Sequence, residues 1–253
     1  MNFFAYRSVA ERYARYRPYF HPLVIEKIKT YLQLQQPVSF AVDVGCGSGH
    51  STVALKEIAD FVAGLDLSAE MLAVAERKPA IHYVRSAAER LAIKSNSADL
   101  LTTSMAYHWF EPTQFFAEVR RVLQDRAWLV IFNNGFTGKM KESPAFEQWV
   151  TEMYEVHFPT PQRNTAPMTA QFAQQHGFIF PYQEEYQNEV EFTIEELVAY
   201  LVTQSNVIAA TEQGRQNVHD VYDWLIAQAR PFFPSRKTTF HFRGFIWYLQ
   251  KAA

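Results

Sequence analysis

Three glycines and two aspartates in the first third of the chain have the residue types and spacing of a ligand site. Gly45, Gly47 and Gly49 lie within five residues, although the chain of 253 residues has only nine glycines. Glycine permits a tight turn and lets a bound molecule approach the backbone closely. Asp43 precedes this loop, and Asp66 follows it. A carboxylate at Asp66 can accept hydrogen bonds from both hydroxyls of a ribose, so we predict a nucleoside ligand; the alternative is a turn residue that leads into a helix.

The charge of the loop decides between two cofactors. A dinucleotide site has the spacing G-x-G-x-x-G and holds a pyrophosphate at a helix N-terminus, whereas this loop has G-x-G-x-G followed by His50. Asp43, which we expect to point into the same crevice, disfavours a pyrophosphate and favours an ammonium group. S-adenosylmethionine carries an ammonium, a sulfonium and no phosphate. The loop therefore favours S-adenosylmethionine, and a nicotinamide-dependent oxidoreductase is the competing interpretation.

The elements around this loop are expected to form a doubly wound, Rossmann-like α/β sheet. Short apolar runs predict strands at 38–44, 61–66, 81–84, 98–103 and 128–132. Helical patterns predict helices at 50–59, 69–77 and 113–123, with Ser68 as an N-cap. Strands that alternate with helices indicate a parallel sheet covered on both faces. Ligands of such sheets bind beyond the carboxyl ends of the strands, which is where the glycine loop and Asp66 lie.

The pattern after residue 136 is looser. It predicts helices at 142–157, at 169–176 before Gly177 and at 218–229, and strands at 182–192 and 238–249. Thr193 and Glu196 have the spacing of a capping box that opens a further helix. We expect a single domain with a mostly parallel, seven-stranded sheet. Its parts are an N-terminal helical lid (1–37), a cofactor-binding core (38–135), and the rest of the sheet with a substrate-facing helical cap (136–253).

Composition disfavours several classes of partner. The formal net charge is −2 and no long basic stripe is present, so we expect no nucleic-acid or membrane partner. Cys46 is the only cysteine, which excludes an intrachain disulfide and a thiolate metal site. No signal peptide and no apolar run of membrane-spanning length is visible. We expect a cytoplasmic protein without a metal, and the sequence carries no signal for its oligomeric state.

Several motifs resemble those of class I S-adenosylmethionine-dependent methyltransferases. Val-Asp-Val-Gly-Cys-Gly-Ser-Gly at 42–49 is similar to the first motif of that family, and Gly-Leu-Asp-Leu-Ser-Ala-Glu-Met-Leu at 64–72 to the second. Residues 86–91 with 97–102, and residues 120–123, are similar to later segments. The usual Pro-Gly-Gly before the fifth strand is replaced by a turn at 124–127, which we expect to change only the turn geometry. Residues 13–18 and 106–110 resemble the small-molecule branch that includes trans-aconitate methyltransferase-like proteins.

The resemblance implies a set of cofactor contacts. The glycines approach the cofactor, Asp43 favours its amino group, Asp66 binds ribose, and the adenine lies against Leu67 and Met71. Tyr13 and Arg17 close over the methionine end; the alternative is a helix interface for Tyr13 and a solvated Arg17. The implied cofactor-binding residues are Tyr13, Arg17, Asp43, Gly45, Cys46, Gly47, Gly49, Asp66, Leu67, Met71, Ala88, Glu89, Ser104 and Met105.

The acceptor side is expected at Tyr107, His108 and Trp109, directly after the fourth strand. Methyl transfer is an in-line displacement with a good leaving group, so placement and desolvation can supply much of the catalysis. A base is needed only for an acceptor that is protonated. His108 is the candidate base, expected to be the only histidine beside the methyl group; the alternative is a structural partner of Trp109. We predict methyl transfer to a small molecule, with carboxylic acids among the candidates. The alternative is a non-catalytic S-adenosylmethionine-binding sensor or partner subunit.

Overall fold

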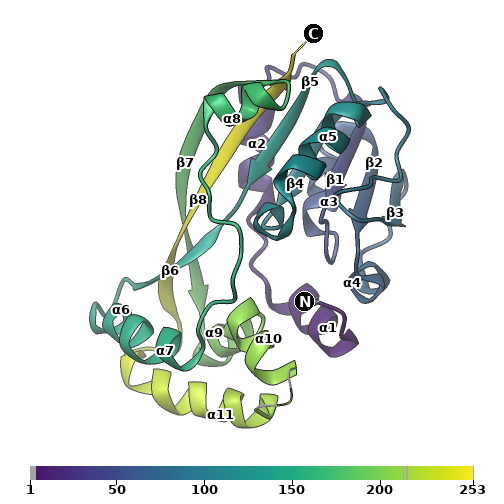
Figure 1. Cartoon of the computed structure of the whole chain (residues 1–253). Helices are drawn as coiled ribbons and strands as arrows, with labels where there is room; N and C mark the ends of the chain where they lie inside the picture. The colour runs from purple at the N-terminus through teal and green to yellow at the C-terminus, as the bar shows by residue number, and fades with distance from the viewer. Residues whose placement is uncertain (1–3, 213, 215, 253) are drawn as a thin grey trace. The chain divides into compact units, whose positions relative to one another are not determined.

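The computed structural model describes residues 4–212, 214 and 216–252, which form two compact units (Figure 1). Unit 1 consists of Met1–Pro18, Asn134–Gln162 and Tyr186–Gly244. Unit 2 consists of Tyr19–Asn133, Arg163–Glu185 and Phe245–Ala253. Strands β7 (Phe178–Phe192) and β8 (Thr238–Lys251) contribute residues to both units.

Unit 2 contains the parallel sheet that the apolar runs predict. Its parallel strands lie in the order β3-β2-β1-β4-β5. They are β1 (Val38–Val44), β2 (Ala59–Asp66), β3 (Ile81–Arg85), β4 (Ala98–Ser104) and β5 (Leu123–Phe132). The end of β8 pairs antiparallel with β5. The Rossmann-like α/β fold is thereby confirmed.

The sheet has eight strands rather than the expected seven. The strand missed by the sequence pattern is β6 (Gly135–Met140), which pairs antiparallel with β8 in unit 1. Two glycines within its six residues weaken its strand signal. The turn expected at 124–127 is also wrong, because β5 already begins at Leu123 and accommodates Arg126 at a φ of 63°.

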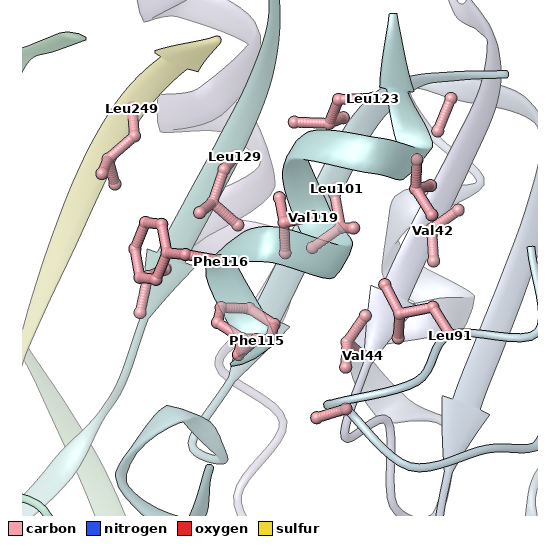
Figure 2. Close-up of a cluster of buried hydrophobic side chains, with 14 of the residues drawn as sticks. Val42, Val44, Leu91, Leu101, Phe115, Phe116, Val119, Leu123, Leu129 and Leu249 are labelled. Atoms are coloured by element: carbon pink, nitrogen blue, oxygen red, sulfur yellow. The ribbon is translucent and has the colours of Figure 1, made fainter. Parts of the chain in front are cut away.

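Helices cover the sheet of unit 2. In Figure 1, α5 (Pro112–Val122) lies in front of the strands and α2 (His21–Tyr31) lies behind them. Helix α5 begins at Pro112 because the carboxylate of Glu111 accepts hydrogen bonds from the next two free backbone amides. Its Phe115, Phe116 and Val119 pack against strand residues such as Leu129 (Figure 2). The other described α-helices of this unit are α3 (His50–Leu55), α4 (Ala69–Val74) and α8 (Ala170–Gln175).

Unit 1 has its own aromatic core, which includes Phe146, Tyr200 and Phe240. The capping box at Thr193 and Glu196 is confirmed. The helix expected at 142–157 begins at Ala145 and contains a π-helical stretch. The helices of this unit are α1 (Arg7–Tyr16), α6 (Ala145–Trp149), the π-helix Val150–Tyr154, α7 (Glu155–His157), α9 (Ile194–Leu201), α10 (Ser205–Glu212), α11 (Val218–Ala229) and the short 3₁₀ turn Arg230–Phe232. None of the described helices in either unit is long and apolar enough to span a membrane.

Candidate active site

The glycine loop joins β1 to α3 at the carboxyl edge of the sheet. Gly45 has a φ of 69°, and a Cβ atom there would lie 2.5 Å from the Cβ of Ala106 and 2.9 Å from the ring of Phe110. Gly49 has a φ of 82° and is the N-cap of α3. A side chain at Gly49 would collide with the Tyr83 hydroxyl. Glycine is therefore required at both ends of the loop, by backbone conformation and by close approach of neighbours.

Asp66, at the end of β2, ties this loop to the next helix. Its Oδ2 accepts a hydrogen bond from the Gly47 amide at 2.8 Å, and its Oδ1 accepts one from the Ser68 amide at 2.8 Å. Burial raises the pKa of the Asp66 carboxyl, while these amide bonds act in the opposite direction. The Ser68 hydroxyl in turn accepts from the Met71 amide at 3.1 Å, so the predicted N-cap is confirmed. Each Asp66 oxygen keeps a lone pair for a ligand hydroxyl.

Asp43 is buried inside unit 2 rather than facing the expected crevice. Its side chain is fully buried, and it accepts hydrogen bonds from the hydroxyls of Ser51 at 2.6 Å, Thr52 at 2.7 Å and Thr102 at 3.0 Å. Burial raises its pKa to about 6, against the effect of those three hydroxyls, and the nearby Asp66 raises it further. Asp43 therefore fixes the first turn of α3 against β4. Because its carboxylate is fully buried, it could attract a ligand ammonium only through its charge and without direct contact.

The two carboxylates leave the site with negative charge. Within the part of the chain that the structure describes, neither Asp43 nor Asp66 forms an ion pair; both bind neutral hydroxyl or amide donors. A cationic ligand would compensate this charge, whereas a pyrophosphate would be repelled by it. The residues present therefore fit the ammonium and sulfonium groups of S-adenosylmethionine.

The residues expected around the adenine differ in exposure. The Leu67 side chain is 54% exposed, whereas Met71 and Ala88 are buried. The methyl group of Met71 lies 3.7 Å from where a Cβ of Gly47 would be. The Glu89 carboxylate accepts a hydrogen bond from the Glu111 amide at 3.0 Å. Cys46 is buried within the loop. The cofactor contacts of these residues stay predictions.

Ser104, at the end of β4, has a histidine beside it that the sequence did not indicate. Its hydroxyl lies 3.3 Å from Nε2 of His21, the first residue of α2. The expectation that His108 is the only histidine near this position is therefore wrong. The contact joins residues 83 positions apart, and no local pattern predicts it. Met105 follows with a φ of 57°, which a side chain rarely adopts.

The segment expected to line the acceptor forms a short 3₁₀ turn, Tyr107–Trp109. The Tyr107 ring packs into the core of unit 2, with its centroid 5.9 Å from that of Phe115 and 6.1 Å from that of Trp247. Burial raises the pKa of Tyr107 to about 12. The His108 ring lies 4.8 Å from that of Trp109, which favours the packing alternative for His108. Its role as a base stays a prediction.

Tyr13 and Arg17 lie in unit 1. The Arg17 guanidinium lies 4.6 Å from the Tyr13 ring centroid and 5.3 Å from that of Tyr200, and it donates to the Thr203 carbonyl at 2.7 Å. Arg17 is thus held by two aromatic faces and one carbonyl, rather than solvated. Its predicted approach to the carboxylate of the cofactor, with Tyr13 over the methionine end, stays a prediction.

Comparisons with known proteins agree with this geometry. Residues 42–131 match the profile of a methyltransferase domain. This segment is thereby identified as a methyltransferase domain. It is 31% identical over 128 residues to a Dictyostelium discoideum protein assigned as a methyltransferase, covering 51% of this chain and 48% of that protein. It is 35% identical over 149 residues to the malonyl-[acyl-carrier protein] O-methyltransferase of Marinomonas sp., covering 54% of each.

The fold is shared along nearly the whole chain with a solved structure. A protein of Anaeromyxobacter dehalogenans assigned to the type II methyltransferases superposes with a TM-score of 0.70 at 21% identity, covering 93% of this chain and 97% of that chain. In sequence, the match spans about half the length of the two curated relatives. The resemblance to trans-aconitate methyltransferase-like proteins stays a prediction.

Sequence reasoning missed several residues of the candidate site. Ser51 and Thr52 carry a detectable signal, since two hydroxyl side chains follow the glycine loop directly. Thr102 lies in the polar second half of β4, and the register pairs it with Asp43. Tyr83, which closes over Gly49, is indicated only by the fold. No group of three potential metal ligands occurs among the residues that the structure describes.

Proposed function

We propose that this methyltransferase moves the methyl group of S-adenosylmethionine to a small-molecule acceptor, with carboxylic acids as the first class to test. One observation carries the proposal: Asp66 is held against the Gly47 amide at the carboxyl edge of the sheet, in a site whose negative charge has no ion-pair partner within the described chain. A ligand with a ribose and a cationic tail matches both features.

The residues of unit 2 would divide the work of holding the cofactor. The backbone of the loop at 45–49 would contact the methionine part, Asp66 would accept from the ribose hydroxyls, and Leu67 and Met71 would flank the adenine. When bound, S-adenosylmethionine supplies an electrophilic methyl group on a sulfonium. The contribution of the protein is to place that group and to exclude water around it. Ser104, which is 8% exposed, lies at the strand end where the methyl group is expected.

The acceptor class is supported by two observations. The Marinomonas relative is named for O-methyl transfer to a malonyl group, which has a free carboxylate as its oxygen nucleophile. A carboxylate needs no general base, and this agrees with the packing of His108 against Trp109. The net charge of −2 favours a small molecule over a nucleic acid. A cytoplasmic location belongs to the same proposal, supported by the single, unpaired Cys46.

Calorimetric titration with S-adenosylmethionine, S-adenosylhomocysteine and NAD tests the cofactor. We expect micromolar binding of the two sulfur ligands and none of NAD. Asp66→Ala removes charged hydrogen bonds worth about 1.5–3 kcal/mol each, so its affinity should fall at least about tenfold. Asp60→Ala, at the exposed opposite end of the same strand, is the matched control and should bind normally.

Transfer of a radiolabelled methyl group to small carboxylic acids and phenols then tests the acceptor. Transfer to a carboxylic acid supports the proposal in full. Cofactor binding without transfer to any compound would favour the non-catalytic sensor. Failure of both sulfur ligands to bind would refute the proposed function.

A further inference from the structure

His21 sits at the point where the strand order of the sheet reverses. From β1, the chain builds outward through β2 and β3 on one side and through β4 and β5 on the other. Ligands of such sheets bind at this switch point, beyond the carboxyl ends of the two central strands. His21 contacts both sides of it. Its Nε2 lies 3.3 Å from the Ser104 hydroxyl at the end of β4, and its ring centroid lies 6.1 Å from that of His50, which follows the glycine loop after β1.

Aromatic neighbours hold the imidazole of His21 in place. The Phe20 ring stacks on it with a centroid distance of 4.2 Å, and Phe132 meets it edge-on at 6.3 Å. The residue is 6% exposed. Burial, with a smaller contribution from the neighbouring His50, lowers the pKa of His21 to about 3. The ring is therefore neutral, and it adds no positive charge beside the place where a sulfonium would lie.

One nitrogen of this ring has unused hydrogen-bonding capacity. Nε2 is bonded to Ser104, whereas Nδ1 is buried and has no hydrogen-bond partner among the described residues. A buried polar atom without a partner destabilises the protein, and a ligand that forms a hydrogen bond with it removes that cost. A neutral imidazole has one donor and one acceptor nitrogen. If Ser104 donates to Nε2, then Nδ1 carries the proton and donates; in the other tautomer Nδ1 accepts.

We propose that His21 binds the acceptor: Nδ1 forms a hydrogen bond with the nucleophilic oxygen of the acceptor while Nε2 stays bonded to Ser104. This inference rests on the proposed function and adds the residue that positions the acceptor. A carboxylate oxygen accepts from Nδ1–H, and a hydroxyl donates to bare Nδ1. The neighbouring Tyr19, whose ring lies 5.5 Å from that of His21, is 51% exposed, so this side of the imidazole is close to solvent.

The transfer step balances for both kinds of oxygen. A lone pair of the acceptor oxygen forms the new C–O bond as the C–S bond breaks, and the electron pair of that bond returns to sulfur. A carboxylate becomes a neutral ester without proton transfer. A hydroxyl passes its proton to Nδ1 of His21, which releases it to solvent afterwards.

Nuclear magnetic resonance of histidine-labelled protein tests the placement of His21. S-adenosylmethionine and S-adenosylhomocysteine differ only in the methyl group and its charge. An imidazole that faces the acceptor position must respond to that difference. We expect the His21 ring nitrogens to shift differently in the two complexes, while those of His82, exposed on β3, shift equally. His21→Phe, or His21→Gln should the first variant fail to fold, assigns the resonance.

Each outcome decides the proposal. A His21 signal that is the same in both complexes, or a His82 signal that changes as much, would overturn it. The tautomer read from the same spectra identifies the acceptor class: a proton on Nδ1 fits a carboxylate, and a proton on Nε2 fits a hydroxyl. Calorimetry on the wild type keeps the two hypotheses apart. If neither sulfur ligand binds, the proposed function is wrong. If both bind and the His21 ring-nitrogen shifts are the same in the two complexes, only this inference is wrong.

Discussion

Acid should destabilise the fold through His21, because the folded protein holds its imidazole neutral. The folded pKa is about 3, lowered mainly by burial from the ordinary value of 6.5. Between these two values the unfolded chain binds more protons than the folded protein. The stability contributed by this site is therefore complete above the unfolded pKa and is lost as the pH falls toward 3.

The size of the effect follows from the two pKa values. At about pH 5, the pH is about 1.5 units below the pKa of His21 in the unfolded chain, so this histidine is protonated there but not in the folded protein. Protonation therefore stabilises the unfolded chain by about 2 kcal/mol. His21→Phe keeps a ring of similar size and removes the titration. Urea unfolding of both proteins at about pH 7.5 and about pH 5 should show that the wild type loses about 2 kcal/mol more than the variant.

The comparison isolates this histidine, because every other titrating group is present in both proteins. Asp43, whose buried carboxyl titrates in a neighbouring pH range, cancels in the difference. If the two proteins lose stability in parallel between these pH values, His21 is not held neutral by burial. The imidazole could then also carry a positive charge beside the expected position of the methyl group.

Three further predictions concern the loop and the helix caps. The first is that the free energy of unfolding of Asp43→Asn, relative to that of the wild type, should rise by up to about 3 kcal/mol between about pH 4 and pH 7. The folded pKa of Asp43 is raised to about 6, so the wild type loses stability as the pH rises through that window. Urea-unfolding free energies that change in parallel with pH would contradict this. The second is that Gly49→Ala should lower the melting temperature more than Gly214→Ala. Both glycines have a positive φ, but only Gly49 also lies against Tyr83. Equal decreases in melting temperature would show that the contact with Tyr83 adds nothing to the cost of the positive φ. Thr193→Ala should cost about 1 kcal/mol of unfolding free energy through the lost cap of α9, and an unchanged denaturation midpoint would show that the cap is dispensable.

The strands of unit 2 could be predicted because each is a short apolar run with an abrupt polar or glycine boundary. The N-caps Ser68 and Thr193 could also be predicted, since each cap depends on a residue three positions later in the sequence. Strand β6 could not be predicted, because Gly135 and Gly138 interrupt its pattern and its partner residues on β8 lie 100 to 108 positions later. Local signals fail where pairing at long range decides.

The candidate site shows the same division. The glycine loop and Asp66 follow from spacing, and their contact through the Gly47 amide agrees with it. The burial of Asp43 does not follow, because its three hydroxyl partners come from α3 and β4 and depend on the register between strands. The role of His21 is still harder to predict from the sequence, since its contact with Ser104 forms only when α2 packs on the sheet.

The hydrogen bond between the Gly47 amide and Asp66 also bears on when the loop acquires its shape. Because the bond is formed within the protein itself, at 2.8 Å, the loop is ordered by folding rather than by its ligand. Binding of the cofactor then carries little entropic cost for ordering the loop. The association rate should be limited by diffusion of the cofactor to the site rather than by rearrangement of the loop. If the proposed methyl transfer takes place here, S-adenosylhomocysteine would leave the same preformed loop that the next S-adenosylmethionine binds, so the product should compete with the substrate cofactor.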